Sequence, residues 1–360
     1  MNEVDIRITQ TTQPKAKPTL EEEASLGFGT TFSDHMFVME YDSDQGWHDA
    51  RIVPFGPIGF LPSAAVFHYG AEVFEGLKAY RTADGKVQLF RPEENAQRLF
   101  NSAERLCIPA VSPEDFMEAL NVLMEVEKDW VPHSFGSSLY LRPFLFATDP
   151  ALGLHTIHHA MFVIIASPSG SYYKEGINPV KIMIETEDVR AVRGGTGYAK
   201  CGGNYAAANR AGYKAEQKGY TQVLWLDGVH QKYIEEVGAM NVMFKIAGKI
   251  VTPDLIGTVL PGITRKSCIE LLKEMGYEVE ERRISVEEII EALENGTLEE
   301  MWGTGTAAVV SPVGHLAYKE KEYCINNNEI GPVTQKLYDE LTGIQWGKIE
   351  DKRNWIVPVK

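Results

Sequence analysis

The sequence has few cysteines, no long apolar run and no excess of positive charge, and each absence excludes a class of protein. The four cysteines among 360 residues lie far apart and form no CxxC pair, so no disulfide framework is indicated and we expect free thiols. No stretch approaches the roughly 18 apolar residues of a membrane span. The first residues, MNEVDIRITQ, contain no apolar signal-peptide core. We therefore expect a cytoplasmic protein.

Acidic residues outnumber basic ones, with 50 Asp and Glu against 35 Lys and Arg and a formal charge of −15. This excess argues against nucleic acid or an anionic membrane surface as a partner and leaves small molecules. No cluster of metal ligands is evident either. His155, His158 and His159 lie close in sequence, but two adjacent histidines point in different directions and no supporting carboxylate is near, so we expect a polar loop.

The length and composition predict two domains. A chain of 360 residues exceeds what one hydrophobic core normally supports. Glycine, serine and proline cluster in SPSGSYYKEGINP, so we place an interdomain loop at 169–180, between a small domain over 1–168 and a larger one over 181–360. Residues 1–24 are polar and contain prolines, and we expect them to form a loosely packed arm.

Hydrophobic periodicity predicts strands and helices without regular βαβ alternation, so the expected fold class is α+β. The expected strands are 31–41, 87–90, 138–147, 160–167, 180–185, 221–226, 232–236, 240–246 and 249–251. Helices are expected from Pro92, from the N-cap Ser112, and over 204–218, 263–275, 285–294 and 332–341. Alternation in 138–147 puts Tyr140 and Arg142 on one face, which is typical of a ligand site or an interface.

The stretch GGTGYAKCGGNY, 194–205, places Lys200 among five glycines before a helical segment. Glycine allows a close approach of backbone and ligand. An ammonium in a partly dry site loses its preference for charge and becomes nucleophilic, as Schiff-base chemistry requires. By itself, however, such a stretch is more often a turn that caps a helix.

Candidates for the other parts of a pyridoxal phosphate site follow Lys200 in the sequence. Tyr205 offers a hydroxyl, Glu236 a carboxylate at a strand end, and PGITR at 261–265 a helix N-terminus suited to a phosphate. The GTGTA loop at 303–307 adds backbone N–H donors. Taken singly, the carboxylate is more often an exposed charge at a strand end, and the PGITR run is also typical of an ordinary helix entry. The GTGTAA run is not a dinucleotide fingerprint, because VVSP follows it where a helix would be required.

Taken together, these residues closely resemble the branched-chain amino-acid aminotransferases, pyridoxal-phosphate enzymes of fold type IV. The resemblance runs in order from about Phe28 to Val357. Its most specific blocks are FGTTFSDHM, HYGAEVFEGLKAY, LFRPEENAQR, SLYLRP, YAKCGGNYAA, EEVGAMN, LPGITR and GTGTAA. It implies the D-amino-acid aminotransferase-like fold, with a small N-terminal α/β domain and a larger C-terminal domain that carries the lysine.

The resemblance also implies a role for each candidate residue. Lys200 would form the Schiff base and move the proton between the substrate Cα and the cofactor. The other cofactor-binding residues would be Arg98, Tyr205, Glu236, Ile263, Thr264 and Thr306. The substrate-binding residues would be Phe28, Tyr69, Phe74, Tyr140, Arg142, Leu154, Tyr172, Thr306 and Ala307. Tyr69 and Leu154 would reach in from the partner subunit of a homodimer.

The chain departs from the family pattern at two places. Ala239 stands where some members have a threonine, so a hydrogen bond near Tyr205 and Lys200 is absent or replaced by water. Ala308 and Ser311 stand where some members carry a CxxC pair, which rules out a thiol switch there. A D-amino-acid aminotransferase, an aminodeoxychorismate lyase and a non-catalytic ligand-binding homologue remain as alternative functions on the same fold.

Overall fold

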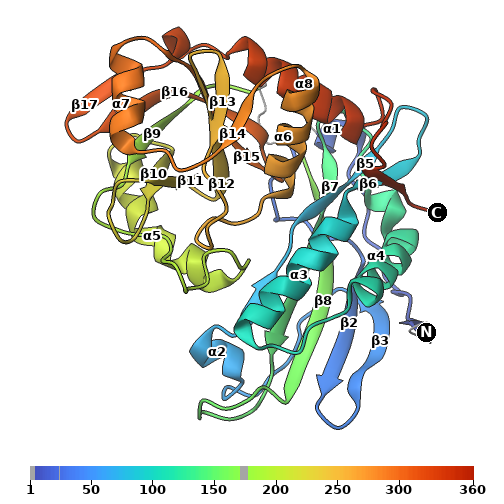
Figure 1. Ribbon diagram of the computed structural model, residues 1–360. Coiled ribbons are helices and arrows are strands. Elements are labelled where there is room, and N and C mark those ends of the chain that lie inside the picture. The colour runs from blue at the N-terminus through green and yellow to red at the C-terminus, as the bar shows by residue number, and fades with distance from the viewer. Residues whose placement is uncertain (1–4, 24, 171–176) are drawn as a thin grey trace. The chain divides into compact units, whose positions relative to one another are not determined.

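The computed structural model describes residues 5–23, 25–170 and 177–360, which divide into two compact units (Figure 1). Unit 1 comprises Met1–Lys174, Ala199–Gly202 and Gly343–Lys360, and unit 2 comprises Glu175–Tyr198 and Gly203–Thr342. The short segment with Lys200 and the C-terminal segment thus belong to unit 1, whereas both were predicted to lie in the second domain. The reason is hydrogen bonding: β18 (Ile356–Pro358) pairs with β6 (Val87–Phe90), and the Phe74 N–H donates to the Lys200 carbonyl.

Unit 1 is built on a sheet in the order β1-β3-β2-β8-β7-β5-β6-β18, with β4 also paired to β7. The remaining strands are β1 (Arg7–Ile8), β2 (His35–Asp42), β3 (Gly46–Pro54), β4 (Glu72–Phe74), β5 (Leu77–Arg81), β7 (Ser138–Ala147) and β8 (His159–Ser169). The helices are α1 (Leu20–Glu23), α2 (Ala65–Tyr69), α3 (Pro92–Leu106) and α4 (Pro113–Glu127), followed by the 3₁₀ turn η1 (Lys128–Trp130).

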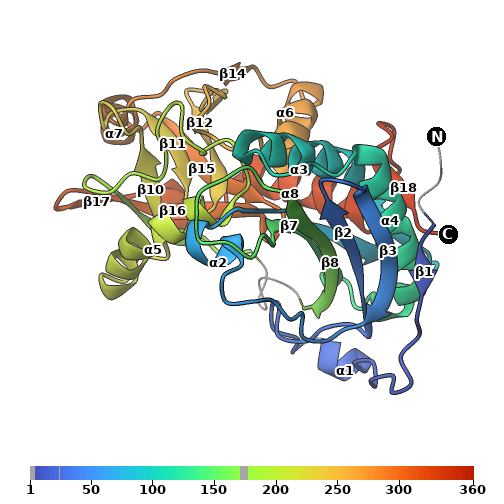
Figure 2. The same ribbon diagram turned by 90° about the horizontal axis from the view of Figure 1, so that it is seen from below.

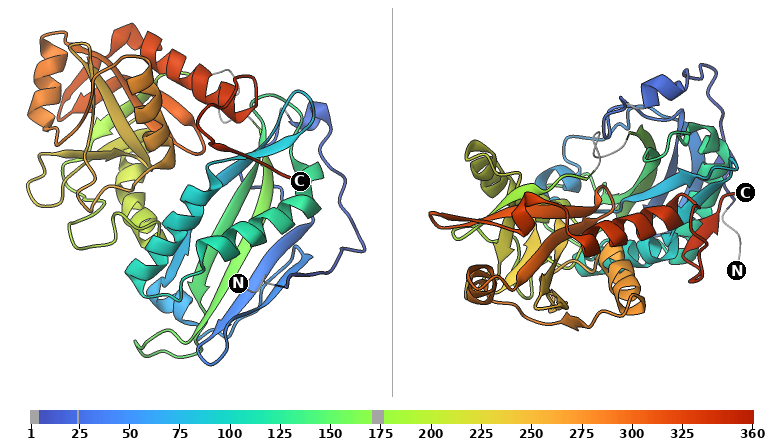
Figure 3. Two further views of the ribbon diagram at one scale, coloured as in Figure 1. Left: turned by 45° about the vertical axis from the view of Figure 1, so that its right-hand side comes forward. Right: turned by 90° about the horizontal axis from the view of Figure 1, so that it is seen from above.

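The two faces of this sheet differ in what covers them. Helices α3 and α4 lie side by side along one face (Figures 2 and 3), where Leu139 and Leu141 of β7 pack with Leu99 and Leu120 of the helices in the main core. The opposite face carries a second apolar cluster around Val163. Because side chains alternate along a strand, the residues of β7 between these leucines belong to the second face.

Tyr140 and Arg142 lie on this second face, as the alternation predicts. The Arg142 Nη2 donates to the Tyr140 hydroxyl over 3.0 Å. Lys78 of β5 is the register partner of Tyr140, and the tyrosine ring folds over the backbone of Gly76, where a Cβ would lie 2.0 Å from the hydroxyl. Only glycine fits at this position without moving the ring.

The N-terminal arm is more ordered than its composition predicts. Strand β1 pairs in parallel with β3. The Thr11 N–H donates to His35 Nε2 and the Lys15 N–H donates to Asp34 Oδ1, each over 2.9 Å. These backbone donors find their acceptors at the start of β2, and Ile6 packs against the main core, so both polar and apolar contacts tie this part of the arm to the sheet.

Unit 2 is built on a sheet in the order β11-β10-β9-β16-β15-β12-β13-β14, with β17 on β16 and a further pairing of β11 with β12. The strands are β9 (Val180–Ile184), β10 (Gln222–Leu226), β11 (Ile234–Val237), β12 (Met240–Ile246), β13 (Lys249–Thr252), β14 (Val279–Glu281), β15 (Leu298–Gly305), β16 (Val309–Tyr318) and β17 (Lys321–Cys324). Its helices are α5 (Gly202–Gln217), α6 (Ile263–Glu274), α7 (Val286–Glu294) and α8 (Pro332–Gln345), with the 3₁₀ turn η2 (Asn326–Asn328). The first residue of α5 and the last three residues of α8 belong to unit 1.

Most of the predicted elements are confirmed to within a few residues. The strands over 138–147 and 240–246 match their predicted bounds. Ser112 and Ser285 cap α4 and α7, each accepting a hydrogen bond from the N–H three residues on. Ala247 and Gly248, both with positive φ, form the tight turn between β12 and β13. The elements that were not predicted are the short helices α1 and α2 and the strands β1, β3, β4, β5, β14, β15, β17 and β18, whereas β16 begins with the VVSP run at 309–312, which indicates a strand followed by a turn in the sequence.

No helix within the described residues is long and apolar enough to cross a membrane. The cytoplasmic location stays a prediction.

Substituting Gly76 by alanine tests the close packing of Tyr140. The new Cβ would lie 2.0 Å from the Tyr140 hydroxyl and 2.9 Å from Cζ, so we expect Gly76→Ala to lower the free energy of unfolding by about 1–3 kcal/mol. Chemical denaturation measures this. Gly59→Ala is the control, because no heavy atom lies within 4 Å of the position that its methyl would take, and it should change stability by less than about 0.5 kcal/mol. Wild-type stability of Gly76→Ala would mean that Tyr140 does not rest on this glycine.

Candidate active site

The backbone of Lys200 is anchored to two elements of unit 1. Its N–H donates to Ser102 Oγ of α3 over 3.0 Å, and its carbonyl accepts from the Phe74 N–H of β4 over 2.9 Å. Its Nζ lies 4.7 Å from the centre of the Phe74 ring. Burial, reinforced by the nearby Arg98 guanidinium, lowers the pKa of Lys200 to about 8. The fraction of neutral amine near neutral pH is therefore much larger than for an exposed lysine.

Arg98 is held by a fully buried carboxylate. Glu75, in the bend between β4 and β5, accepts from Arg98 Nε over 2.7 Å and from Arg98 Nη2 over 2.9 Å. Asn95 Nδ2 donates to the same carboxylate over 2.7 Å. Burial favours the neutral acid, but the charge and hydrogen bonds of Arg98 outweigh it and keep the pKa of Glu75 below its ordinary value. The orientation of the Arg98 guanidinium is thereby set.

Aromatic side chains surround Arg142 on the second face of the sheet. The Arg142 guanidinium lies 4.8 Å from the centre of the Phe74 ring and 5.3 Å from that of Tyr140. The Phe28 ring meets Tyr140 edge to face, with centroids 4.7 Å apart. The structure thus brings together Phe28, Phe74, Tyr140 and Arg142, and Phe74 links them to Lys200. An apolar wall with one guanidinium is suited to hold either an aliphatic or an acidic side chain.

Tyr69 and Leu154 are placed at the surface of unit 1. Tyr69 ends α2, and its hydroxyl donates to the carbonyl of Leu152. Leu154 follows in the same loop and is 83% exposed. Phe67 and Leu152 are also exposed beside them. Tyr172, the remaining predicted substrate-binding residue, lies outside the described residues.

Glu236 of β11 is buried in unit 2 and held by two donors. Its Oε1 accepts from the Leu260 N–H over 2.7 Å and lies 3.4 Å from Arg190 Nη2. Burial raises the pKa of the adjacent Glu235, against a hydrogen bond from Thr258. Glu236 is therefore a buried carboxylate that the Leu260 N–H and the Arg190 guanidinium hold in place.

The N-terminus of α6 lies next to this carboxylate in unit 2. Asn241 is the register partner of Glu236, and its Nδ2 donates to the Leu260 carbonyl over 2.9 Å. Gly262 is the N-cap and makes no side-chain cap hydrogen bond. A Cβ at Gly262 would lie 1.9 Å from Asn241 Oδ1. Ile263 and Thr264 then begin the helix, where backbone N–H groups and the helix dipole favour an anion.

The GTGTA loop is brought to the same part of unit 2. Asn241 is also the register partner of Thr304, which precedes the turn carrying Thr306 and Ala307 between β15 and β16. Tyr205 lies in the first turns of α5 and is partly buried. The predicted residues therefore fall into two groups, one in each unit.

Each group by itself has features that pyridoxal phosphate requires of a binding site. The amine of Lys200 has the lowered pKa that bond formation to an aldehyde requires, and Glu236 offers a buried carboxyl group of the kind that pairs with a protonated ring nitrogen. The cap of α6, crowded against Asn241 so that no side chain fits, leaves a backbone cradle of the kind that holds phosphate. Among the described residues, no group of three or more His, Cys, Asp or Glu is placed to hold a metal ion.

Several residues that organise these groups were missed in the sequence. Asn95 and Ser102 lie three residues before and four residues after Arg98, so the three share one face of α3, and all are buried. This polar stripe on an otherwise apolar helix face was a detectable signal. Glu75, Arg190 and Asn241 gave no such signal, because a single polar residue at a strand end or in a loop is ordinary.

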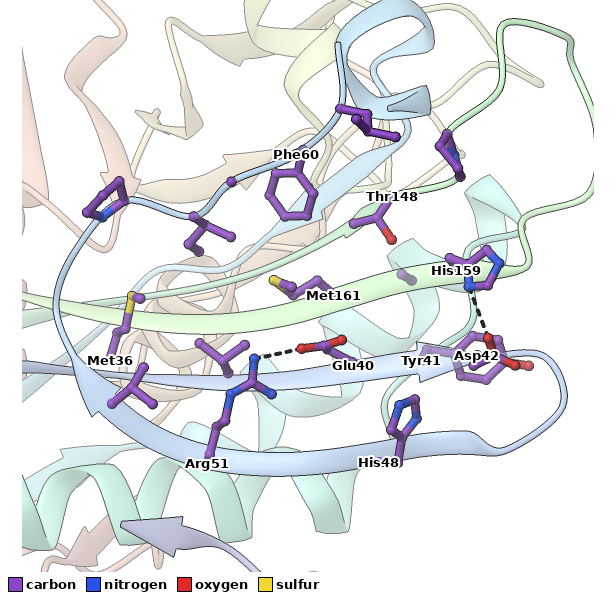
Figure 4. A pocket seen from close by; sticks show the side chains of 18 residues that line it. Met36, Glu40, Tyr41, Asp42, His48, Arg51, Phe60, Thr148, His159 and Met161 are labelled. Atoms are coloured by element: carbon purple, nitrogen blue, oxygen red, sulfur yellow. Dashed lines mark hydrogen bonds and ion pairs between the residues drawn. The ribbon is translucent and has the colours of Figure 1, made fainter. Parts of the chain in front are cut away.

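A separate pocket of about 660 Å³ lies on the second face of the unit 1 sheet (Figure 4). Met36, Phe60 and Met161 contribute apolar surface to it, while Arg51 contacts Glu40 at 2.6 Å and His159 contacts Asp42 at 3.2 Å. None of the predicted site residues lines this pocket. We therefore do not assign the chemistry of Lys200 to it.

The comparisons with known proteins agree with this chemistry. The amino-transferase class IV family matches residues 72–316, a range that includes the lysine-bearing segment. The chain is 53% identical to branched-chain-amino-acid aminotransferase 2 of Bacillus subtilis (strain 168), over 99% of this chain and 97% of that protein.

Two solved structures of branched-chain amino acid aminotransferases are also similar. One is the enzyme from Escherichia coli (TM-score 0.72, 26% identity, 91% of this chain and 99% of that chain). The other is the T.th. enzyme with pyridoxamine 5′-phosphate (TM-score 0.74, 27% identity, 89% of this chain and 98% of that chain). The chain therefore belongs to the class IV aminotransferases and has their fold-type IV architecture.

Proposed function

We propose that this protein is a pyridoxal-phosphate-dependent branched-chain amino-acid aminotransferase. It transfers the amino group of L-leucine, L-isoleucine or L-valine to 2-oxoglutarate, giving the branched 2-oxo acid and L-glutamate. The observation that carries the proposal is the Lys200 amine, whose pKa is lowered to about 8 beside an aromatic wall that ends in a guanidinium. The 53% identity to the Bacillus subtilis enzyme supports the substrate class.

Each residue has a defined task in this proposal. Pyridoxal phosphate, when bound, supplies the electron sink that makes the substrate Cα–H acidic. Lys200 is the base that takes the proton from the substrate Cα, and Glu236 holds a proton on the ring nitrogen. Arg98 and the N-terminus of α6, at Ile263 and Thr264, bind phosphate oxygens. Tyr205 donates to the ring oxygen, and the N–H groups of Thr306 and Ala307 bind the α-carboxylate.

Replacing Lys200 tests the assignment of the base. We expect Lys200→Ala to remain folded but to lose transamination and the visible absorption of the bound cofactor, because proton transfer alone contributes about 10²–10⁴ in rate. Activity with L- and D-leucine and the visible spectrum are the measurements. Lys218→Ala, at an exposed lysine just after α5, is the control and should behave as wild type. Substantial activity in Lys200→Ala would contradict the assignment.

Arg142 explains how one pocket accepts both leucine and glutamate. Burying an unpaired carboxylate costs several kcal/mol, so the glutamate side chain needs a cation that leucine does not contact. We expect Arg142→Gln to weaken glutamate and 2-oxoglutarate by about 2–4 kcal/mol in kcat/KM terms and leucine much less. Single-turnover rates of each half-reaction measure this separately.

Arg142→Lys is the matched variant for this test. It retains the positive charge but loses the planar fork that donates to Tyr140, so it should keep part of the preference for glutamate. Equal losses for leucine and glutamate in Arg142→Gln would show that Arg142 only braces Tyr140, or that it binds the α-carboxylate common to both substrates.

The protein is further proposed to be a homodimer in which Tyr69 and Leu154 reach the site of the partner subunit. Supporting this, Phe67, Tyr69, Leu152 and Leu154 are exposed apolar side chains on α2 and the loop that its last residue contacts. We expect Leu154→Arg to dissociate the dimer in sedimentation experiments and to lower activity. Val229→Arg, at another exposed apolar residue in unit 2, is the control. A fully active wild-type monomer at assay concentration would refute the dimer.

A further inference from the structure

We propose that Glu75 is a positioning residue for the reaction: it orients the Arg98 guanidinium and supplies the negative charge beside which the Lys200 amine ionises. The inference rests on the proposed function and deepens it, because it concerns the same lysine. It is carried by the geometry of one wholly buried carboxylate that is hydrogen-bonded to Arg98 and directly follows Phe74, whose N–H binds the Lys200 carbonyl and whose ring centre lies 4.7 Å from the Lys200 Nζ. The mechanism proposed above does not otherwise use this carboxylate.

Four hydrogen bonds fix the position of the Glu75 carboxylate. Besides the two bonds from Arg98 and the one from Asn95, its Oε2 accepts from the Gly76 N–H over 3.1 Å. Arg98 and Asn95 share one face of α3, while Glu75 comes from the bend after β4. The carboxylate is therefore a fixed point that joins the helix to the strand, and the same two elements hold the Lys200 backbone.

The charged and titratable groups around Lys200 come from three elements and one bend. Arg98 lies on α3, Glu75 in the bend after β4, Tyr140 and Arg142 on β7, and Glu72 on β4 accepts from the nearby Gly202 N–H. The charges of Arg98 and Arg142 disfavour protonation of the amine, and that of Glu75 favours it. Without Glu75, burial and the charges of Arg98 and Arg142 would lower the pKa of the Lys200 amine further.

A second consequence concerns Arg98 itself. A buried guanidinium that loses its carboxylate partner is left uncompensated, and its planar group is no longer aligned. Glu75 thus acts on two side chains. It holds Arg98, which is assigned to the phosphate, in a defined orientation, and its charge limits how far the pKa of the Lys200 amine falls.

The test measures the ionisation of Lys200 in the apoenzyme, where cofactor and turnover play no part. Competitive acetylation with acetic anhydride, quantified at Lys200 by peptide mass spectrometry over neutral to alkaline pH, gives the midpoint at which the amine becomes reactive. We expect Glu75→Gln to lower this midpoint by about one pH unit, as for removal of a nearby opposite charge. In the holoenzyme, the pH at which the visible band of bound pyridoxal phosphate changes should move in the same direction.

Two further variants separate charge from packing. Glu75→Asp keeps the negative charge on a side chain that is shorter by one methylene. The acetylation midpoint of Lys200 in this variant should therefore stay closer to wild type than in Glu75→Gln. Glu127→Gln is the charge-matched control, because Glu127 is another buried glutamate of unit 1, held by His35 at the start of β2. It should leave the Lys200 midpoint unchanged even if it lowers stability.

If Glu75→Gln does not fold, the pair Arg98→Met and Arg98→Met/Glu75→Gln replaces it, since removing both partners of a buried ion pair is tolerated better than removing one. The double variant should then have the lower midpoint of the two. An unchanged midpoint in a folded Glu75→Gln, or between these two variants, would overturn the proposal and leave Glu75 with a purely structural role. Failure of the proposed function would appear differently, as a wild-type chain without transaminase activity.

Discussion

The polar contacts of unit 1 depend on one constraint: the Lys200 amine lies near the Arg98 guanidinium, and its pKa is lowered. Two cations in a dry site repel each other, and the fully buried carboxylate of Glu75 compensates them. The carboxylate binds Arg98 and Asn95 of α3, and the same helix receives the Lys200 N–H through Ser102. The helix, the bend after β4 and the lysine segment are therefore coupled by polar contacts: Ser102 and Phe74 hold the Lys200 backbone, and Glu75 balances the charge of the amine.

One face of the unit 1 sheet forms the hydrophobic core, and the other face carries the residues that we propose bind the substrate. Leu139 and Leu141 of β7 are buried in the core with α3 and α4, while Tyr140 and Arg142 point to the other side. Period-two alternation makes this possible within a single strand, because neighbouring residues serve opposite faces. The core residues fix the strand, and Gly76 leaves room for the Tyr140 ring. The side chains on the second face are thus held in place by the same strand that forms the core, as a pocket for a small aliphatic side chain requires.

In unit 2, the groups that we propose for anion binding are backbone N–H groups instead of charged side chains. Asn241 is a register partner of both Glu236 and Thr304, and its amide also donates to the Leu260 carbonyl ahead of α6. Asn241 therefore pairs through its strand with Glu236 and Thr304 and through its side-chain amide with the residue ahead of the α6 N-terminus. Leu260 in turn donates its N–H to Glu236. An anion cradle built from backbone N–H groups needs no lysine, which agrees with the acidic composition of the chain.

The sequence by itself determined the local elements and the identity of the chemistry. Proline and serine helix starts and the alternation in β7 follow from short-range rules, and eight ordered motifs indicated the family. Tertiary structure alone decided which residues support that chemistry. Glu75 is separated from Arg98 by 23 residues and from Lys200 by many more. Its significance arises only when a bend, a helix and a distant glycine-rich segment are buried together, and burial turns an ordinary carboxylate into the counter-charge of two cations.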